Sequence, residues 1–139
     1  MFTLNVKIPC DLNEIEKLEK VIGEQLSLYQ SSVRDHICFI VHELLINSFE
    51  ATVKTFSAPS SLYSINAHVE MTHSEYIIHI TDECGGVKGE VFTHELEDIL
   101  LEERGRGLLM VRELVDSISF HQNDEEGLFT VLVKKERGA

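Results

Sequence analysis

Apolar and polar residues alternate in five short stretches of this chain. Strict alternation is the pattern of a strand that buries one face, and Pro9 closes the first stretch. The turn at 72–74 predicts that the second and third strands form an antiparallel hairpin, and the turn at 123–127 joins the last two. The predicted strands are 2–8, 64–71, 76–81, 117–121 and 128–134.

Three other stretches have apolar residues at three-, four- and seven-residue steps, the period of a helix with one buried face. The first opens with Asp11 and Glu14 in a capping-box arrangement. Ser31 or Ser32 is predicted to cap the second. The predicted helices run from Asp11 to about Leu28, from about Ser32 to Phe56, and from Gly107 onward with Leu108, Val111, Leu114 and Val115 on the inner side.

The order of these elements predicts an α/β (α+β) two-layer sandwich, in which one layer of helices covers a largely antiparallel sheet. At 139 residues, the chain is predicted to form one domain over 1–139. Twelve basic and twenty-four acidic side chains give a net charge of −12. Nucleic acid and anionic membrane surfaces are therefore disfavoured as partners, and a basic surface on another protein is favoured. Without a membrane-length apolar run or a signal-peptide pattern, the expected location is cytoplasmic.

Cysteine and histidine give little support to a metal centre. The three cysteines are an odd number and widely spaced, which argues against a disulfide framework and against a zinc pair. His42 and Glu43 begin like a zinc-protease motif, but Ile46 stands where the second histidine would be. The sequence therefore excludes that class of metalloprotease.

Candidate chemistry begins on the central predicted helix, where Glu43 and Asn47 are four residues apart and so lie on the same face. At a polyphosphate, the carboxylate could deprotonate a hydroxyl or water, and the amide oxygen could complete the ligand shell of Mg²⁺. The alternative is a half-exposed helix with two ordinary polar residues.

Asp82 ends a strand whose inner face carries Ile78 and Ile80. A carboxylate buried there needs hydrogen-bond donors, and an adenine amino group is a suitable one. The alternative is a strand-end turn in which the aspartate bonds its own backbone. Further along, Gly105 and Gly107 flank the start of a helix, whose N-terminal N–H groups suit a phosphate. The alternative there is a tight turn with no ligand.

Three sequence patterns, taken together, resemble the N, G1 and G2 boxes of the GHKL, or histidine-kinase-like, ATPase superfamily. They are Glu43-x-x-x-Asn47, Asp82-x-Cys84-x-Gly86 and Gly105-x-Gly107, and the resemblance spans about Val33 to Val115. Within that superfamily the chain is most similar to the bacterial anti-sigma-factor serine kinases of the RsbW and SpoIIAB type. This resemblance implies a Bergerat-type ATP-binding fold with a mostly antiparallel mixed sheet covered on one face by helices.

The resemblance also implies roles for individual residues, with ATP and Mg²⁺ as cofactors. Glu43 would be the general base, Asn47 would bind magnesium, and Asp82 would accept a hydrogen bond from adenine. The residues implied to surround the nucleotide are Gly86 at the base, Gly105, Gly107 and Leu108 at the phosphates, and Arg104 or Arg106 at the transferred group. The implied partners are a sigma factor and an antagonist (anti-anti-sigma) protein that is phosphorylated on serine, and a homodimer is expected.

Two departures from the pattern support other hypotheses. Cys84 replaces the first glycine of the middle box, and a left-handed backbone there would cost about 1–2 kcal/mol. Acidic residues gather between 90 and 103, close to a site meant for a triphosphate. A nucleotide-binding or degenerate adaptor that acts by binding alone is therefore a second hypothesis. A stand-alone histidine-kinase ATPase module is a third, and it would need a phosphoacceptor from another protein.

Overall fold

A computed structural model describes residues 1–85 and 106–137 of the chain. Each strand and helix predicted from the pattern is present in this part, with bounds that differ by a few residues at most. The strands are β1 (Phe2–Pro9), β2 (Ser64–Met71), β3 (Glu75–Asp82), β4 (Ser117–Asn123) and β5 (Leu128–Glu136). The helices are α1 (Leu12–Gln25), α2 (Ser31–Thr55) and α4 (Arg106–Leu114), with short 3-10 turns η1 (Leu26–Leu28) and η2 (Ser60–Leu62).

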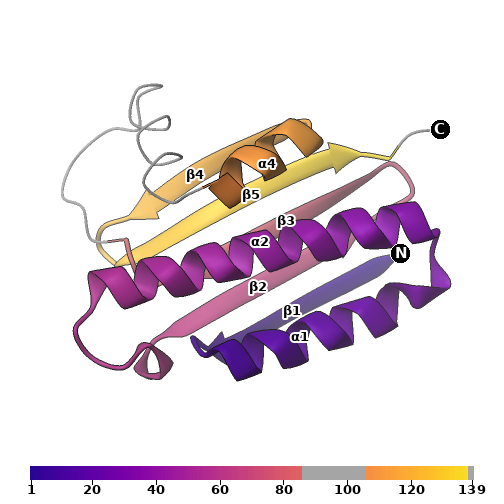
Figure 1. Cartoon of the computed structure of the whole chain (residues 1–139). Coiled ribbons are helices and arrows are strands. Elements are labelled where there is room, and N and C mark those ends of the chain that lie inside the picture. Colours follow the sequence, from indigo (N-terminus) through magenta and orange to yellow (C-terminus); the bar gives the residue numbers. More distant parts are fainter. Residues whose placement is uncertain (86–105, 138–139) are drawn as a thin grey trace.

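The strands form one sheet in the order β1-β2-β3-β5-β4, and every pairing among the described strands is antiparallel. β2 and β3 are joined by the turn at 72–74, which confirms the predicted hairpin (Figure 1). The predicted two-layer α+β architecture is confirmed as well. The parallel pairing that a mixed sheet would contain does not occur among these strands.

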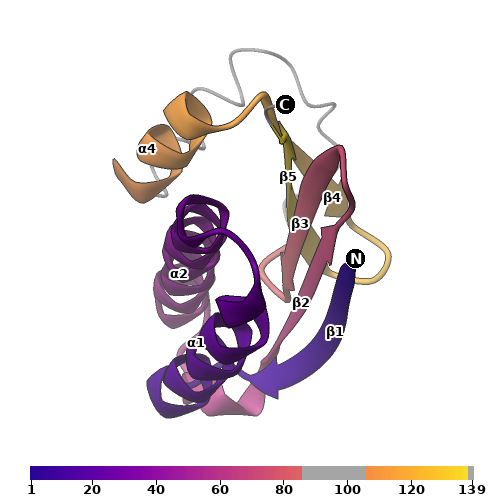
Figure 2. The ribbon, with the colours of Figure 1, turned by 90° about the vertical axis from the view of Figure 1, so that its right-hand side faces the viewer.

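All the described helices pack on one face of the sheet, with α2 between α1 and α4 (Figure 2). The alternation of each strand turns its apolar residues toward this layer. Because α2 contacts α1, α4 and β3, it is apolar on more than one side, and it lies at the centre of the core. The largest fully buried side chains from sheet and helices include Ile65, Ile78, Ile80, Ile37, Ile40 and Leu44.

Helix capping differs from the prediction. Asp11 occupies the N-cap position of α1, but its side chain makes no capping hydrogen bond. α2 starts one residue earlier than predicted, because Gln30 has a non-helical backbone and its carbonyl accepts from the Arg34 N–H at 3.0 Å. Ser31 is therefore already helical, and the prediction that Ser31 or Ser32 caps this helix was wrong.

Several predicted features lie outside the described residues. These are the acidic segment between 90 and 103 and the candidate residues Gly86, Arg104 and Gly105. On α4, Leu108 and Val111 are buried as predicted, whereas Leu114 is 37% exposed. Among the described residues, no helix has both the length and the apolar character needed to cross a bilayer.

Candidate functional site

The start of α4 lies directly against the middle of α2. Gly107 has no side chain, and a Cβ built on it would overlap carboxylate oxygen Oε2 of Glu43. The two residues are 64 positions apart in sequence, so this contact is made by the packing of α4 on α2. The structure therefore brings together two of the predicted features, a helical carboxylate and a glycine at a helix N-terminus.

Asn47 lies one turn after Glu43 and is 5% exposed. The next residue, Ser48, is 1% exposed, and its hydroxyl has no hydrogen-bond partner in the described part of the chain. Buried polar atoms are usually paired, since an unpaired one costs about 1–3 kcal/mol. This turn of α2 therefore carries polar groups into the core beside Glu43, and one of them, the Ser48 hydroxyl, has no partner among the described residues.

Asp82 is at the end of β3, 1% exposed, on the inner face that the alternation predicted. Its Oδ1 accepts a hydrogen bond from the Cys84 backbone N–H at 3.0 Å. The strand-end turn considered from sequence is thus present. It coexists with the buried, helix-facing position that an adenine-binding aspartate would need.

Thr52 connects the end of β3 to α2, and sequence reasoning missed it. Its hydroxyl donates to the Ser48 carbonyl at 2.7 Å and lies 3.5 Å from the Cys84 sulfur. The pKa of the Cys10 thiol is raised overall, chiefly by burial. A hydrogen bond with Thr52 acts in the opposite direction, and the charge of Asp82 adds to the rise. Thr52 therefore contacts two thiols, Cys84 and Cys10, and the charge of Asp82 acts on the second of them. A second polar residue, four positions after Ser48 on a largely apolar helix, was the signal available in the sequence.

Glycine is required after the strand, but at a different position from the one that the box pattern suggested. Cys84 does not have a left-handed backbone, since no non-glycine residue in the described part of the chain has a positive φ. The predicted strain at Cys84 therefore does not arise. Gly85, by contrast, lies against β5, and a Cβ there would overlap the backbone carbonyl of Leu128.

The remaining predicted residues are only partly described. Arg106 begins α4, but its side chain lies outside the described part of the structure. Leu108 is fully buried, so its side chain anchors α4 in the core and only its backbone could face a ligand.

The donors of this site fit magnesium bound together with phosphates. No group of three His, Cys, Asp or Glu side chains within residues 1–85 and 106–137 could hold a metal ion. Mg²⁺ in nucleotide sites commonly takes one or two protein oxygens and completes its shell with phosphate and water. Asn47 supplies an oxygen of this kind, and the Glu43 carboxylate lies beside Gly107 at the start of α4, where unpaired N–H groups suit a phosphate.

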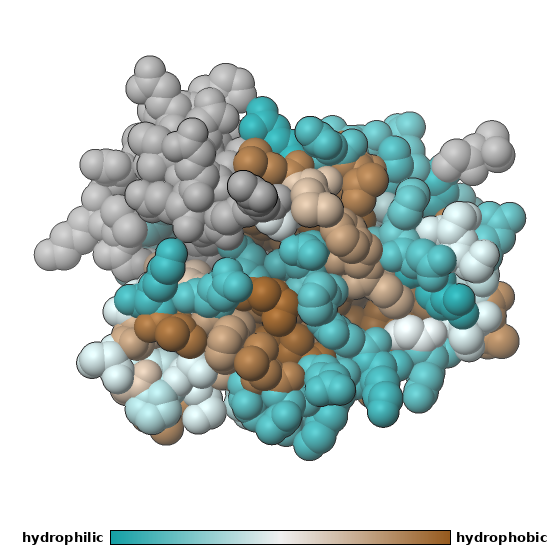
Figure 3. Space-filling view, viewed as in Figure 1, coloured by the Kyte–Doolittle hydropathy of each residue, from teal (hydrophilic) through white to brown (hydrophobic). Residues whose placement is uncertain are grey.

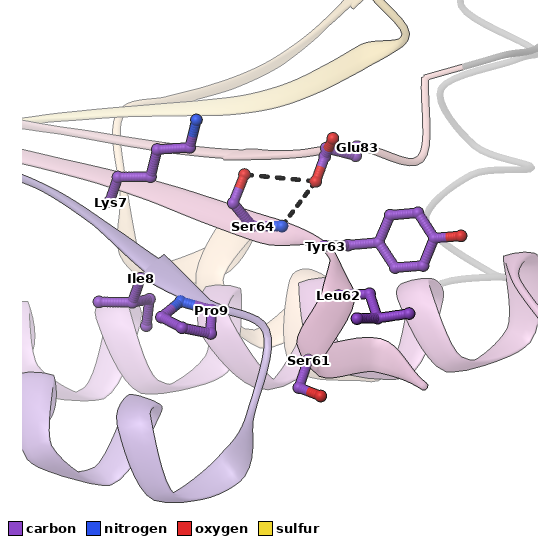
Figure 4. A pocket seen from close by; sticks show the side chains of 8 residues that line it. All are labelled: Lys7, Ile8, Pro9, Ser61, Leu62, Tyr63, Ser64 and Glu83. Carbon is purple, nitrogen blue, oxygen red and sulfur yellow. Dashed lines mark hydrogen bonds between the residues drawn. The ribbon is translucent and has the colours of Figure 1, made fainter. Parts of the chain in front are cut away.

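A separate hollow of about 450 Å³ lies beside the end of β3 (Figure 4). Glu83 lines it and accepts hydrogen bonds from the Ser64 N–H at 2.6 Å and the Ser64 hydroxyl at 3.3 Å. Strand alternation points Glu83 away from the helix layer that Asp82 faces. The Glu83 carboxylate therefore ties the ends of β2 and β3 together on the opposite side of the sheet.

The fold and these contacts define a class of protein: a two-layer α+β domain in which α2 carries polar residues that contact α4 at Glu43 and the residues after β3 at Thr52. No family model matches the sequence, and no curated protein matches it. A solved structure described as the SiaB–SiaC complex from Pseudomonas aeruginosa is similar in fold, with a TM-score of 0.63 and 12% sequence identity. The similarity covers 96% of this chain and 89% of that chain. At this identity the similarity shows the shared fold.

The contact between Gly107 and Glu43 predicts energetic coupling. Gly107→Ala is expected to destabilise the fold by about 1 kcal/mol, because the new methyl group must displace the Glu43 carboxylate. In a Glu43→Ala background the same change is expected to cost nothing, since the overlapping atoms are gone. Urea denaturation of the two single variants and the double variant measures the coupling. Additive effects would mean that the two groups do not touch.

Proposed function

We propose that this protein binds Mg²⁺–ATP between α2, α4 and the end of β3, and transfers the γ-phosphoryl group to a serine of a partner protein. The observation that carries the proposal is the packing of Gly107 against the Glu43 carboxylate, on the same helix face as Asn47. The resemblance to the GHKL boxes supports it independently, because those boxes come from the same three elements.

In this proposal each residue has a distinct task. Glu43 accepts the proton of the attacking serine hydroxyl, the Asn47 amide oxygen is a ligand to magnesium, and the buried Asp82 accepts a hydrogen bond from the adenine amino group. The N–H groups at the start of α4 face the phosphates. When bound, magnesium offsets charge on the triphosphate, so that the protein chiefly positions the reacting groups.

The proposed partners are proteins. By its name, the SiaB–SiaC complex is an assembly of two proteins, which supports partner binding by this fold. The helix-bearing face of the present chain exposes apolar side chains between polar ones (Figure 3). Val53 of α2 and Leu109 and Met110 of α4 are exposed apolar residues of the helix layer. Such residues suit the core of a protein interface. We propose partner switching, in which the protein holds a sigma factor or a similar protein and phosphorylates its antagonist.

Calorimetric titration with ATP, with and without magnesium, tests the nucleotide site. The wild-type protein is expected to bind ATP more tightly when magnesium is present. Asn47→Ala should remove most of that difference, weakening Mg²⁺–ATP binding by about tenfold, or about 1.4 kcal/mol. Asn66→Ala is the matched control, because Asn66 bonds Asn5 on the opposite face of the sheet. Absence of binding, or equal effects of the two variants, would refute the proposed site.

A second candidate function is an adaptor that regulates its partner by binding alone. It is favoured by Asp82, whose carboxylate already bonds the Cys84 N–H within the strand-end turn. Such an adaptor would keep its cellular activity when Glu43 is replaced by alanine, whereas a kinase would lose it.

A further inference from the structure

A second polar hollow lies at the start of α2. It has a volume of about 280 Å³ and is lined by the first turn of α2, by Tyr76 of β3 and by the end of β5. Ser31, where α2 begins, is about 18 Å along the helix axis from Glu43. None of the residues that line this hollow belongs to the proposed nucleotide site.

The helix that points into this hollow has no cap of its own. Gln30, at the N-cap position of α2, makes no side-chain capping bond, and the first turn contains no acidic residue. The first N–H groups of a helix have no partner within it, and they carry a partial positive charge. Ser32 and Val33, which belong to this first turn, line the hollow.

Tyr76 provides an independent sign of a missing ligand. Its side chain is 2% exposed, and its hydroxyl has no hydrogen-bond partner within residues 1–85 and 106–137. Burial, with a smaller contribution from Asp116, raises the pKa of Tyr76 to about 12. The hydroxyl therefore stays protonated near neutral pH and remains a hydrogen-bond donor with no acceptor among the described residues.

Two cationic side chains line the same hollow. Lys135 pairs with Tyr76 across β3 and β5, so it stands on the same face of the sheet. Arg137 follows β5 and donates to the Thr72 carbonyl at 2.7 Å, which holds its guanidinium at this end of the molecule. Two carboxylates oppose them in part. Asp116 lies 3.5 Å from the Lys135 ammonium, and Glu136 also lines the hollow.

We propose that this hollow binds a small oxyanion, a phosphate or carboxylate group, between the start of α2 and the end of β5. The bound oxygens would accept from the Tyr76 hydroxyl and the Ser32 and Val33 N–H groups, and would face Lys135 and Arg137. A ligand here would bridge the helix layer to the sheet at the end of α2 remote from Glu43. The site is therefore a place where a small metabolite can act on the protein without competing with a nucleotide.

Nuclear magnetic resonance titration of the intact chain with inorganic phosphate tests the proposal. The amide signals of Ser32, Val33 and His36 are expected to shift and saturate. Acetate at equal ionic strength distinguishes a carboxylate ligand from a phosphate ligand, and sodium chloride controls for screening. Amide shifts that chloride reproduces, or that fail to appear with both oxyanions, would overturn the site.

Tyr76→Phe removes only the hydroxyl and is expected to weaken oxyanion binding at least tenfold. The variant should also melt at a higher temperature than wild type without the anion, because it no longer buries an unpaired hydroxyl. Tyr63→Phe is the control, since Tyr63 stacks on Phe56 beyond the other end of α2. Unchanged affinity in Tyr76→Phe would refute the proposed role. Shifts at Gly107 and Leu108 report the nucleotide site separately, so either proposal can fail alone.

Discussion

Glu43→Gln is expected to slow ATP turnover by about 10²–10⁴-fold, the usual contribution of a general base. The substitution keeps the shape of the side chain but removes its ability to accept a proton. ATP affinity should change little, because the roles proposed for binding belong to Asn47, Asp82 and the start of α4. The rate of ATP hydrolysis, in which water accepts the γ-phosphoryl group, measures the effect without a protein substrate. Calorimetry measures ATP affinity on the same samples.

Glu50→Gln is the matched control for this experiment. Glu50 lies on α2 two turns after Glu43 and is exposed. Its replacement by glutamine removes the same charge from the same helix. It should leave turnover unchanged. If wild type and Glu43→Gln hydrolyse ATP at the same rate, Glu43 is not the base. If neither hydrolyses ATP or transfers phosphate to any partner although both bind it, the adaptor function is correct.

Gly85→Ala is expected to destabilise the fold by about 3 kcal/mol, at the upper end of the usual cost of overpacking. The added Cβ would overlap the Leu128 carbonyl, and this atom belongs to the backbone of a central strand that cannot easily move. The Gly85 N–H also donates to the Gly127 carbonyl at 3.2 Å, so a shift of either segment breaks that bond. Urea denaturation, followed by circular dichroism, gives the free energy of unfolding.

Gly23→Ala is the control for Gly85→Ala and should have the opposite sign. Gly23 lies inside α1, where an added Cβ would meet only the Cys38 sulfur at 4.0 Å. Alanine is favoured over glycine in a helix by about 0.5–1 kcal/mol, so this variant is expected to be more stable than wild type. Equal destabilisation by both changes would show that Gly85 does not pack as described.

The strands and the face that each one buries could be predicted well because strand alternation is a local property, whereas the strand order could not. Tyr76, Ile78, Ile80 and Asp82 follow one another at every second position, and the structure buries all four. Helix starts were predicted less well. Which of Gln30, Ser31 and Ser32 takes the non-helical N-cap position depends on how the preceding turn returns the chain to the core, and no pattern within those three residues decides it.

The residues of the candidate site could be named from the sequence, whereas the individual contacts between them could not. Glu43, Asn47, Asp82 and Gly107 were each chosen for their chemistry and spacing, while their roles as a site stay predictions. Thr52 and Gly85 were missed. The Thr52 hydroxyl matters because Cys84 arrives beside it from another strand, and Gly85 matters because β5 passes close to it.

The sequence by itself determined the alternation of the strands, the apolar face of each helix, and the order of elements that makes a two-layer α+β fold. These follow from the two-residue period of a strand and the 3.6-residue period of a helix, because each period can be recognised within a single short stretch of sequence. Only the tertiary structure decided that Gly107 meets Glu43, that Leu128 excludes a side chain at Gly85, and that Tyr76 lies beside Lys135 and the start of α2. Each of these contacts joins residues far apart in the chain, and so depends on how all the layers pack together.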